Sequence, residues 1–198
     1  MKSIGNNEHV VSMLGLRRAV EPYFIILEYM ERGNLQTYLC QVRGRKGATN
    51  TDVKCSNLTL TNTDLLKYSH QIAIGMDFIS SKCIVHRDLA TRNILVNELG
   101  VCKIAGFGLA SGVVDERQYR NKIKGRLPIR WLAPETIDGT NFTTKSDVWS
   151  FGILLWEIVT MGNNPYPDMC EWEVTSSLQK GYRMPNPRIA TRTCTLPC

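Results

Sequence analysis

The sequence has no apolar run long enough to cross a membrane as a helix. Its longest run, 148–161, carries Glu157 in its middle, whereas a membrane span needs about 20 apolar residues. Residues 1–8 contain Lys2 but no apolar segment before a small-residue cleavage site, so we expect no secretory signal. The pattern predicts a buried helix over 148–160 and no transmembrane segment in this chain.

Paired cysteine motifs are also missing. The seven cysteines are odd in number and scattered, with no C-x-x-C pair, which is unlike a disulfide framework or a structural zinc site. Glycine (15) and proline (8) are too few for a low-complexity chain, and 43% apolar residues are too many for a disordered one. A globular chain of one or two domains in a reducing compartment fits best.

The first half of the chain contains one predicted strand and one short predicted helix. The apolar run 24–29 has the length of a buried strand, and 35–42 favours a helix. The segment 43–60 is polar, contains glycine and has no hydrophobic period. We therefore expect a surface insertion over 43–60.

The centre of the chain predicts a long helix and a hairpin. Apolar residues at helical spacing predict an amphipathic helix over 64–81, with Thr63 or Asp64 as its N-cap. Two short apolar runs, 94–96 and 101–104, flank a turn and predict a β-hairpin.

A basic segment at 117–130 holds six cations and one tyrosine, Tyr119. Such a run is most often a solvated loop. The net charge of 24 minus 18, or +6, does not separate a regulatory loop from a nucleic-acid surface.

The octet 86–93, His-Arg-Asp-Leu-Ala-Thr-Arg-Asn, lies between the predicted long helix and the hairpin. Taken alone, Asp88 and Asn93 could simply form Asx turns. However, the octet resembles the protein-kinase catalytic loop H-R-D-L-x-x-x-N. It is followed in family order by Ala-Gly-Phe-Gly-Leu-Ala at 105–110 and Ala-Pro-Glu at 133–135. Three motifs in this order identify the chain as similar to protein kinases.

Further motifs resemble the receptor tyrosine kinases. Arg92 stands where serine/threonine kinases carry a lysine, and Pro-Ile-Arg-Trp at 128–131 is similar to the tyrosine-kinase sequence before Ala-Pro-Glu. The resemblance also covers 146–152 and Asn-Pro-Tyr-Pro at 164–167. The insertion 43–60 resembles the kinase insert of split-domain receptors.

The resemblance implies an α+β, protein-kinase-like fold with a remnant of the small β lobe and a mostly α-helical large lobe. It covers a partial catalytic domain over 1–184, with an activation segment at 105–135 and a divergent tail at 185–198. The glycine-rich loop, the ATP-pairing lysine and its glutamate would lie upstream of Met1. We therefore expect a kinase domain truncated at both ends.

The resemblance assigns catalytic roles to Asp88, Arg92 and Asn93. Asp88 would accept the proton of a substrate tyrosine hydroxyl, Arg92 would orient Asp88, and Asn93 would hold one Mg²⁺. ATP and Mg²⁺ are the cofactors that it implies.

It also implies a nucleotide site. Leu27 stands at the gatekeeper position, the backbone of Glu28 and Met30 would bind the adenine, and Leu95 would pack beneath the base. Ordinary core packing accounts equally well for the apolar members of this set.

Regulatory roles follow for Tyr119 and Arg87. Tyr119 fits the phosphorylation site of the activation loop, where a phosphate would add nearly two negative charges beside Arg87 and Arg120 and could order the loop.

Four further residues receive supporting roles from the resemblance. His86 and Phe107 would pack together in the regulatory spine. Asp147 would bond the backbone of the catalytic loop, which is compatible with its acting as a helix N-cap. Glu135 would lack the arginine with which it normally pairs.

Gly106 departs from the family pattern. The family has Asp-Phe-Gly where this chain has Gly106-Phe107-Gly108, and glycine offers no side-chain ligand to a hard cation. Loss of the metal ligand leads us to expect a rate lower by roughly a thousandfold or more.

Three hypotheses of function therefore stand. The first is an impaired protein tyrosine kinase that acts on protein tyrosines in receptor-type signalling, on the cytoplasmic side of the plasma membrane. Its expected partners are phosphotyrosine-binding proteins and a second kinase domain in a dimer, and we expect it to bind no nucleic acid. The second is a pseudokinase scaffold that offers Tyr119 and the insert 43–60 to partners. The third is a truncated product without independent function.

Overall fold

The computed structural model describes residues 5–19, 21–45, 59–112, 127–137 and 141–187. Most of the predicted insertion 43–60, Tyr119 and the end of the predicted tail lie outside the described residues. The described residues form four α-helices and three two-stranded antiparallel sheets, together with short 3-10 turns.

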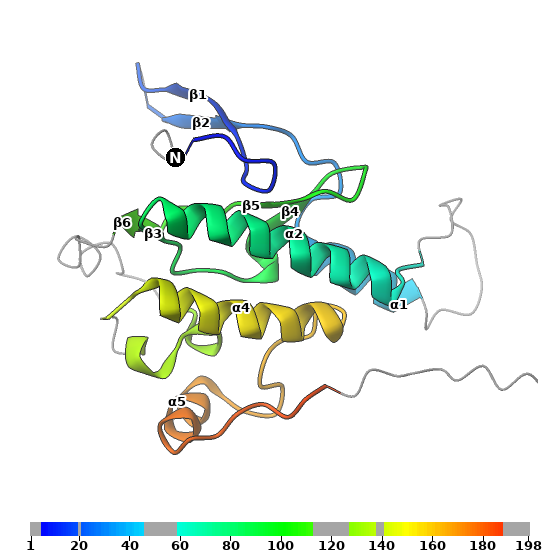
Figure 1. Ribbon diagram of the computed structural model, residues 1–198, viewed down its shortest axis with the longest axis vertical. Helices are drawn as coiled ribbons and strands as arrows, with labels where there is room; N and C mark the ends of the chain where they lie inside the picture. The colour runs from blue at the N-terminus through cyan, green and yellow to red at the C-terminus, as the bar shows by residue number, and fades with distance from the viewer. Residues whose placement is uncertain (1–4, 20, 46–58, 113–126, 138–140, 188–198) are drawn as a thin grey trace, which may run out of the picture.

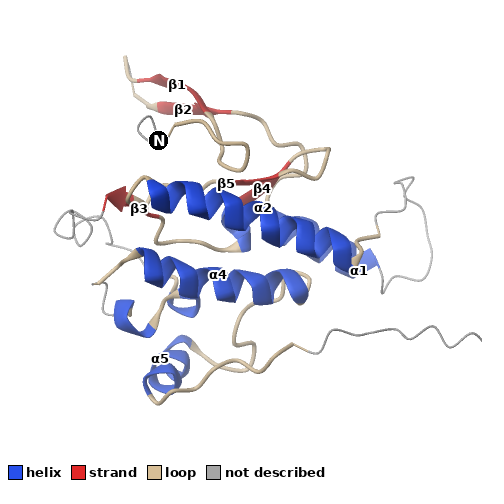
Figure 2. Ribbon diagram, in the orientation of Figure 1, coloured by secondary structure: helices blue, strands red, loops and turns tan. Residues whose placement is uncertain are grey.

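The helices form the body of the molecule, and most of the strands lie along one side of it (Figures 1 and 2). The helices are α1 (Leu35–Arg45), α2 (Asn62–Ser81), α4 (Thr144–Val159) and α5 (Glu171–Gln179). The sheets pair β1 (Met13–Arg17) with β2 (Phe24–Leu27), β3 (Ile84–Val85) with β6 (Ser111–Gly112), and β4 (Ile94–Val96) with β5 (Cys102–Ile104). The mixed helical and strand content confirms the predicted α+β class.

The long predicted helix and the central hairpin are present. Helix α2 begins earlier than predicted, because Thr61 is its N-cap: the Thr61 side chain accepts from Asp64 N at 3.2 Å, and Asp64 Oδ2 accepts from Thr61 N at 2.8 Å. Asp64 is therefore the third helical residue of a capping box, and the prediction of Thr63 or Asp64 as the cap was wrong.

The hydrophobic core lies between α1, α2, α4 and the β4–β5 hairpin. These elements contribute fully buried aliphatic side chains, namely Leu35, Leu39, Ile72, Ile79, Ile94, Ile104, Leu154 and Ile158. Gly75 allows α2 to pack closely against His9 and β5, because a Cβ at this position would lie 2.7 Å from both the carbonyl oxygen of His9 and the Ile104 side chain. The core therefore fixes β4 and β5, and β4 holds the C-terminal end of the loop between β3 and β4.

Helix α4 differs in two ways from its prediction. It begins at Thr144, with Thr143 rather than Asp147 as its N-cap, so its first turn precedes the apolar run. Val148 is 68% exposed, so the predicted burial of this helix was wrong at its first apolar residue. Among the described residues, no helix is long and apolar enough to cross a membrane.

The N-terminal hairpin contradicts the prediction of a buried strand. Strand β2 pairs with β1, from Met13 opposite Leu27 to Arg17 opposite Phe24. Its side chains are nevertheless exposed, Ile25 by 60%, because no other described strand covers this sheet. Helix α1 also extends to Arg45, so the start of the predicted insertion is helical.

Candidate active site

The predicted catalytic loop, residues 86–93, is attached to helix α4 through Asp147. Asp147 Oδ2 accepts from His86 N at 2.7 Å, and its Oδ1 accepts from Arg87 N at 3.0 Å. The carboxylate is buried, and burial raises the pKa of Asp147 against the opposing effect of the two backbone donors. Both oxygens of one side chain thus fix the start of the loop.

A second buried carboxylate, Glu157, fixes the middle of the same loop. Its Oε2 accepts from Thr91 N at 3.1 Å and from Trp131 Nε1 at 2.9 Å, and its Oε1 accepts from the Thr91 hydroxyl at 2.7 Å. Burial raises the pKa of Glu157, although the hydrogen bonds from Thr91 and Trp131 oppose this. The sequence motifs predict no role for Glu157. An isolated acid within an apolar helix was the available signal, because such an acid needs buried donors.

The structure brings Asp88, Arg92 and Asn93 together. Arg92 Nη2 donates to Asp88 Oδ1, and Asn93 Nδ2 donates to Asp88 Oδ2 at 2.8 Å and to the Asp88 carbonyl oxygen at 2.7 Å. The Arg92 guanidinium also lies over the Trp131 ring, 4.1 Å from its centroid. Both oxygens of the Asp88 carboxylate are therefore held by neighbours, and the Trp131 ring against which Arg92 lies is itself held by Glu157.

His86 and Phe107 are in contact, with ring centroids 5.1 Å apart. His86 Nε2 donates to the Ala105 carbonyl oxygen at 2.8 Å, which leaves its Nδ1 to accept from Asp88 N at 3.3 Å. This fully buried ring therefore links the residue before Gly106 to Asp88.

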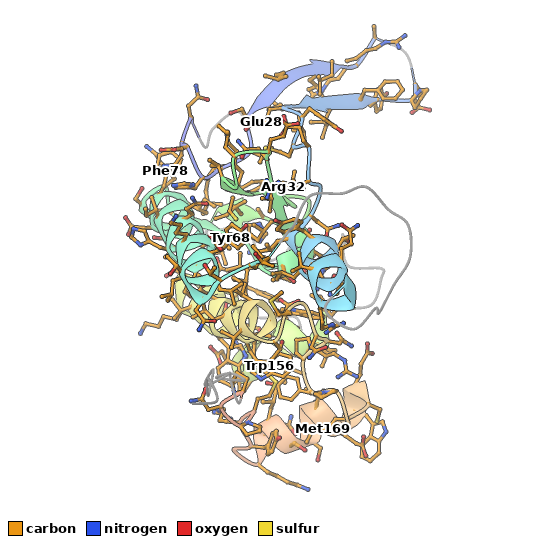
Figure 3. All side chains as sticks on the ribbon, turned by 90° about the vertical axis from the view of Figure 1, so that its right-hand side faces the viewer. Glu28, Arg32, Tyr68, Phe78, Trp156 and Met169 are labelled. Carbon is orange, nitrogen blue, oxygen red and sulfur yellow. The ribbon has the colours of Figure 1, made fainter. Side chains whose placement is uncertain are left out.

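The residues predicted for nucleotide binding lie where the N-terminal hairpin meets the body. Leu27 ends β2, Met30 is buried, and Leu95 lies in β4. The Glu28 carboxylate accepts from Lys103 Nζ at 2.8 and 3.0 Å and from Ser12 N at 2.6 Å. Figure 3 shows Glu28 on the hairpin side of the body, with Arg32 between it and Tyr68.

The Glu28 ion pair changes the acidity of the carboxyl group. Burial alone would raise the pKa of Glu28, but the hydrogen bonds from Lys103 and Ser12 outweigh it and lower the pKa. The charged form is therefore the stable form at this junction.

The family model of the protein tyrosine and serine/threonine kinases matches residues 1–195. The chain belongs to this kinase family. It is 46% identical over 192 residues to the tyrosine kinase receptor Cad96Ca of Drosophila melanogaster, covering 97% of this chain and 25% of that protein. It is 43% identical over 188 residues to the fibroblast growth factor receptor of Strongylocentrotus purpuratus, covering 95% and 19%.

A third relative is the tyrosine-protein kinase receptor torso of Bombyx mori. The two sequences are 40% identical over an alignment of 220 residues, and this alignment covers 94% of this chain and 27% of torso. The chain thus spans about a quarter or less of the length of these curated relatives. The predicted resemblance to receptor tyrosine kinases is confirmed.

The remaining predicted residues occupy separate positions in this kinase chain. Arg87 is buried at a φ of 69°, with its guanidinium over the Phe142 ring at 5.3 Å. Glu135 is exposed in a 3-10 turn. Tyr119, the predicted phosphorylation site, lies outside the described residues, so its pairing with Arg87 stays a prediction.

The magnesium site implied by the kinase family does not fit the residues present. Gly106 supplies no carboxylate, and the Asn93 amide nitrogen faces Asp88. Within the described segments, no group of three or more His, Cys, Asp or Glu side chains is arranged to hold a metal ion. Mg²⁺ is normally bound through one or two carboxylates together with phosphate oxygens, and position 106 supplies no carboxylate.

Proposed function

We propose that this chain is part of a receptor-type protein tyrosine kinase domain that transfers the γ-phosphate of ATP to protein tyrosines with reduced efficiency. The supporting observation is the Asp88 carboxylate, which is held on one oxygen by Arg92 and on the other by Asn93. This arrangement, in a chain 46% identical to a tyrosine kinase receptor, is suited to accepting a proton in a fixed direction.

The proposed reaction uses Asp88 as the proton acceptor. The tyrosine hydroxyl oxygen forms a bond to the γ-phosphorus of ATP, the bond to the ADP oxygen breaks, and the hydroxyl proton passes to Asp88. Arg92 keeps the Asp88 carboxylate in place and adds positive charge beside the reacting groups. Its own position is fixed by the Trp131 ring against which it stacks.

The named relatives are receptors, which supports a membrane-associated setting with protein substrates. We propose protein tyrosines as substrates, phosphotyrosine-binding proteins as partners of the phosphorylated chain, and a second kinase domain as a dimer partner. The proposed location is the cytoplasmic side of the plasma membrane.

A second candidate function is that of a pseudokinase, a binding module with the kinase fold. Gly106 favours it, because the residue that would ligate the metal is missing. The intact set of Asp88, Arg92 and Asn93 favours the first candidate.

A phosphotyrosine assay separates the two. The full chain is incubated with ATP, Mg²⁺ and a tyrosine-containing copolymer, beside an Asp88→Asn variant and an Asp168→Asn control at an exposed position. We expect slow phosphorylation by the wild type and the control, and a rate about 10²–10⁴-fold lower in Asp88→Asn. Equal signals from all three proteins would reject the kinase and leave the pseudokinase.

A further inference from the structure

Gly106 occupies a position that the Asn93 side chain has closed. Its φ is 79°, in the left-handed region, where side chains other than Asn and Asp are uncommon. A Cβ on residue 106 would lie 2.5 Å from Asn93 Cγ, 2.6 Å from Asn93 Oδ1 and 2.9 Å from Asn93 Cβ. Any side chain at 106 would therefore have to displace Asn93.

Asn93 is fixed in this position by its own hydrogen bonds. Its Nδ2 donates to two oxygens of Asp88, and its backbone carbonyl accepts from Ala105 N at 2.8 Å. Because both Asp88 partners are acceptors, the nitrogen must face them, and the amide oxygen faces Gly106. Turning Asn93 away from Gly106 would break two hydrogen bonds to Asp88.

The oxygens that remain are a poor set for a hard cation. Asp88 already accepts from Arg92 on one carboxylate oxygen and from Asn93 on the other. Asn93 then offers a single amide oxygen, and Gly106 offers no side chain. Magnesium and manganese prefer several oxygen ligands that include carboxylates.

We propose that Asn93 and Gly106 form a closed pair that occupies the metal position of this kinase site, so that the chain binds no divalent cation there. The Asn93 side chain, the predicted metal ligand, thereby lies against Gly106 and holds Asp88 through its amide nitrogen. This inference concerns the site of the proposed function and depends on that function only for the choice of nucleotide in the test.

The first test is a double-mutant cycle on the full chain, with the melting temperature as the readout. We expect Gly106→Ala to lower the melting temperature by at least about 2–4 °C, because the new Cβ meets Asn93. The matched control is Gly181→Ala, since Gly181 also has a positive φ, 87°, but a Cβ there meets no atom within 4 Å, so it should cost less. In an Asn93→Ala background the cost of Gly106→Ala should shrink. An equal cost in both backgrounds would overturn the pair.

The second test is a titration with MnCl₂, with and without ADP, followed by the melting temperature and by Mn²⁺ electron paramagnetic resonance. We expect no saturable binding that depends on Asn93. A saturable rise in melting temperature that Asn93→Ala abolishes would overturn the inference. This outcome is independent of the phosphotyrosine assay. If the chain fails that assay but shows coupling between positions 93 and 106 and no Mn²⁺ binding, the proposed function is rejected and the present inference stands.

Discussion

The catalytic loop and the N-terminal hairpin are held to the same body in different ways. Two buried carboxylates of α4, Asp147 and Glu157, accept five hydrogen bonds from the loop and from Trp131. The hairpin exposes its apolar side chains and is tied to β5 by the ion pair of Glu28 with Lys103. The loop therefore shares the stability of the core, whereas the hairpin can open locally.

This difference bears on the proposed function. The residues expected to accept the proton depend on groups buried in the core, and those expected to contact the nucleotide lie beside an exposed sheet. Substitutions of Asp147 or Glu157 should therefore affect the stability of the whole fold. Substitutions in the Glu28–Lys103 ion pair should affect only the N-terminal hairpin.

The largest effect is expected for Asp147→Asn. Both Asp147 oxygens accept from backbone N–H groups, so the amide nitrogen of asparagine would face a donor and leave it unsatisfied. We expect unfolding to become easier by about 1–3 kcal/mol, as measured by urea denaturation. Asp168→Asn, at an exposed position, should change stability by less than about 0.5 kcal/mol. Equal stability of the two variants would contradict the anchoring role of Asp147.

A smaller effect is expected for Glu157→Gln, because glutamine can keep all three hydrogen bonds. Its oxygen can accept from Thr91 N and Trp131 Nε1, and its NH₂ can donate to the Thr91 hydroxyl. The folded-state pKa of Glu157 is raised above 4.5. The contribution of Glu157 to the free energy of unfolding is therefore fully present below pH 4.5 and is lost as pH rises through the folded-state pKa. Glutamine does not titrate and escapes this loss.

Thermal melts from below pH 4.5 to neutral pH test this sign. Relative to wild type, Glu157→Gln should gain stability as the pH rises, while Glu8→Gln, at an exposed position, should follow the wild-type curve. Parallel curves for wild type and Glu157→Gln would show that Glu157 does not carry the shifted titration.

The smallest effect is expected for Lys103→Met, which removes a partly exposed ion pair. We expect a loss of at most about 1 kcal/mol, with faster hydrogen exchange in β1 and β2 and unchanged exchange in α2. Lys67→Met, at an exposed position on α2, is the matched control. Faster exchange throughout the chain would show that the hairpin is part of the core after all.

The same variant has a pH signature opposite to that of Glu157→Gln. Because the folded-state pKa of Glu28 is lowered below 4.5, its contribution is present above pH 4.5 and is lost as pH falls. Without Lys103, this loss on acidification should be smaller.

The family and most secondary-structure elements could be predicted from the sequence because the motifs and turns that indicate them are made of neighbouring residues. The octet 86–93 and the turn between 96 and 101 are of this kind. The prediction that β2 is buried was wrong. Its apolar run is typical of a strand covered on both faces, but the exposure of its side chains depends on which other elements pack against the sheet.

The long-range contacts of the site could not be read from the sequence. Thr91 and Glu157 are 66 residues apart and Trp131 and Glu157 are 26 apart, so no local pattern pairs them. The contact of Asn93 with Gly106 likewise depends on the backbone of both residues. The sequence showed that a metal ligand is absent at 106, but only the structure shows what fills the space.

The buried carboxylate of Glu157 has a consequence for how this chain can change over generations. Its three donors come from two segments. Replacement of Trp131 by a residue without an N–H leaves Oε2 with one donor instead of two, and replacement of Thr91 by a residue without a hydroxyl leaves Oε1 with none of these donors. Substitutions at 91 and 131 should therefore appear in descendants together with a change at 157, whereas Glu157→Gln, which keeps all three hydrogen bonds, can appear alone.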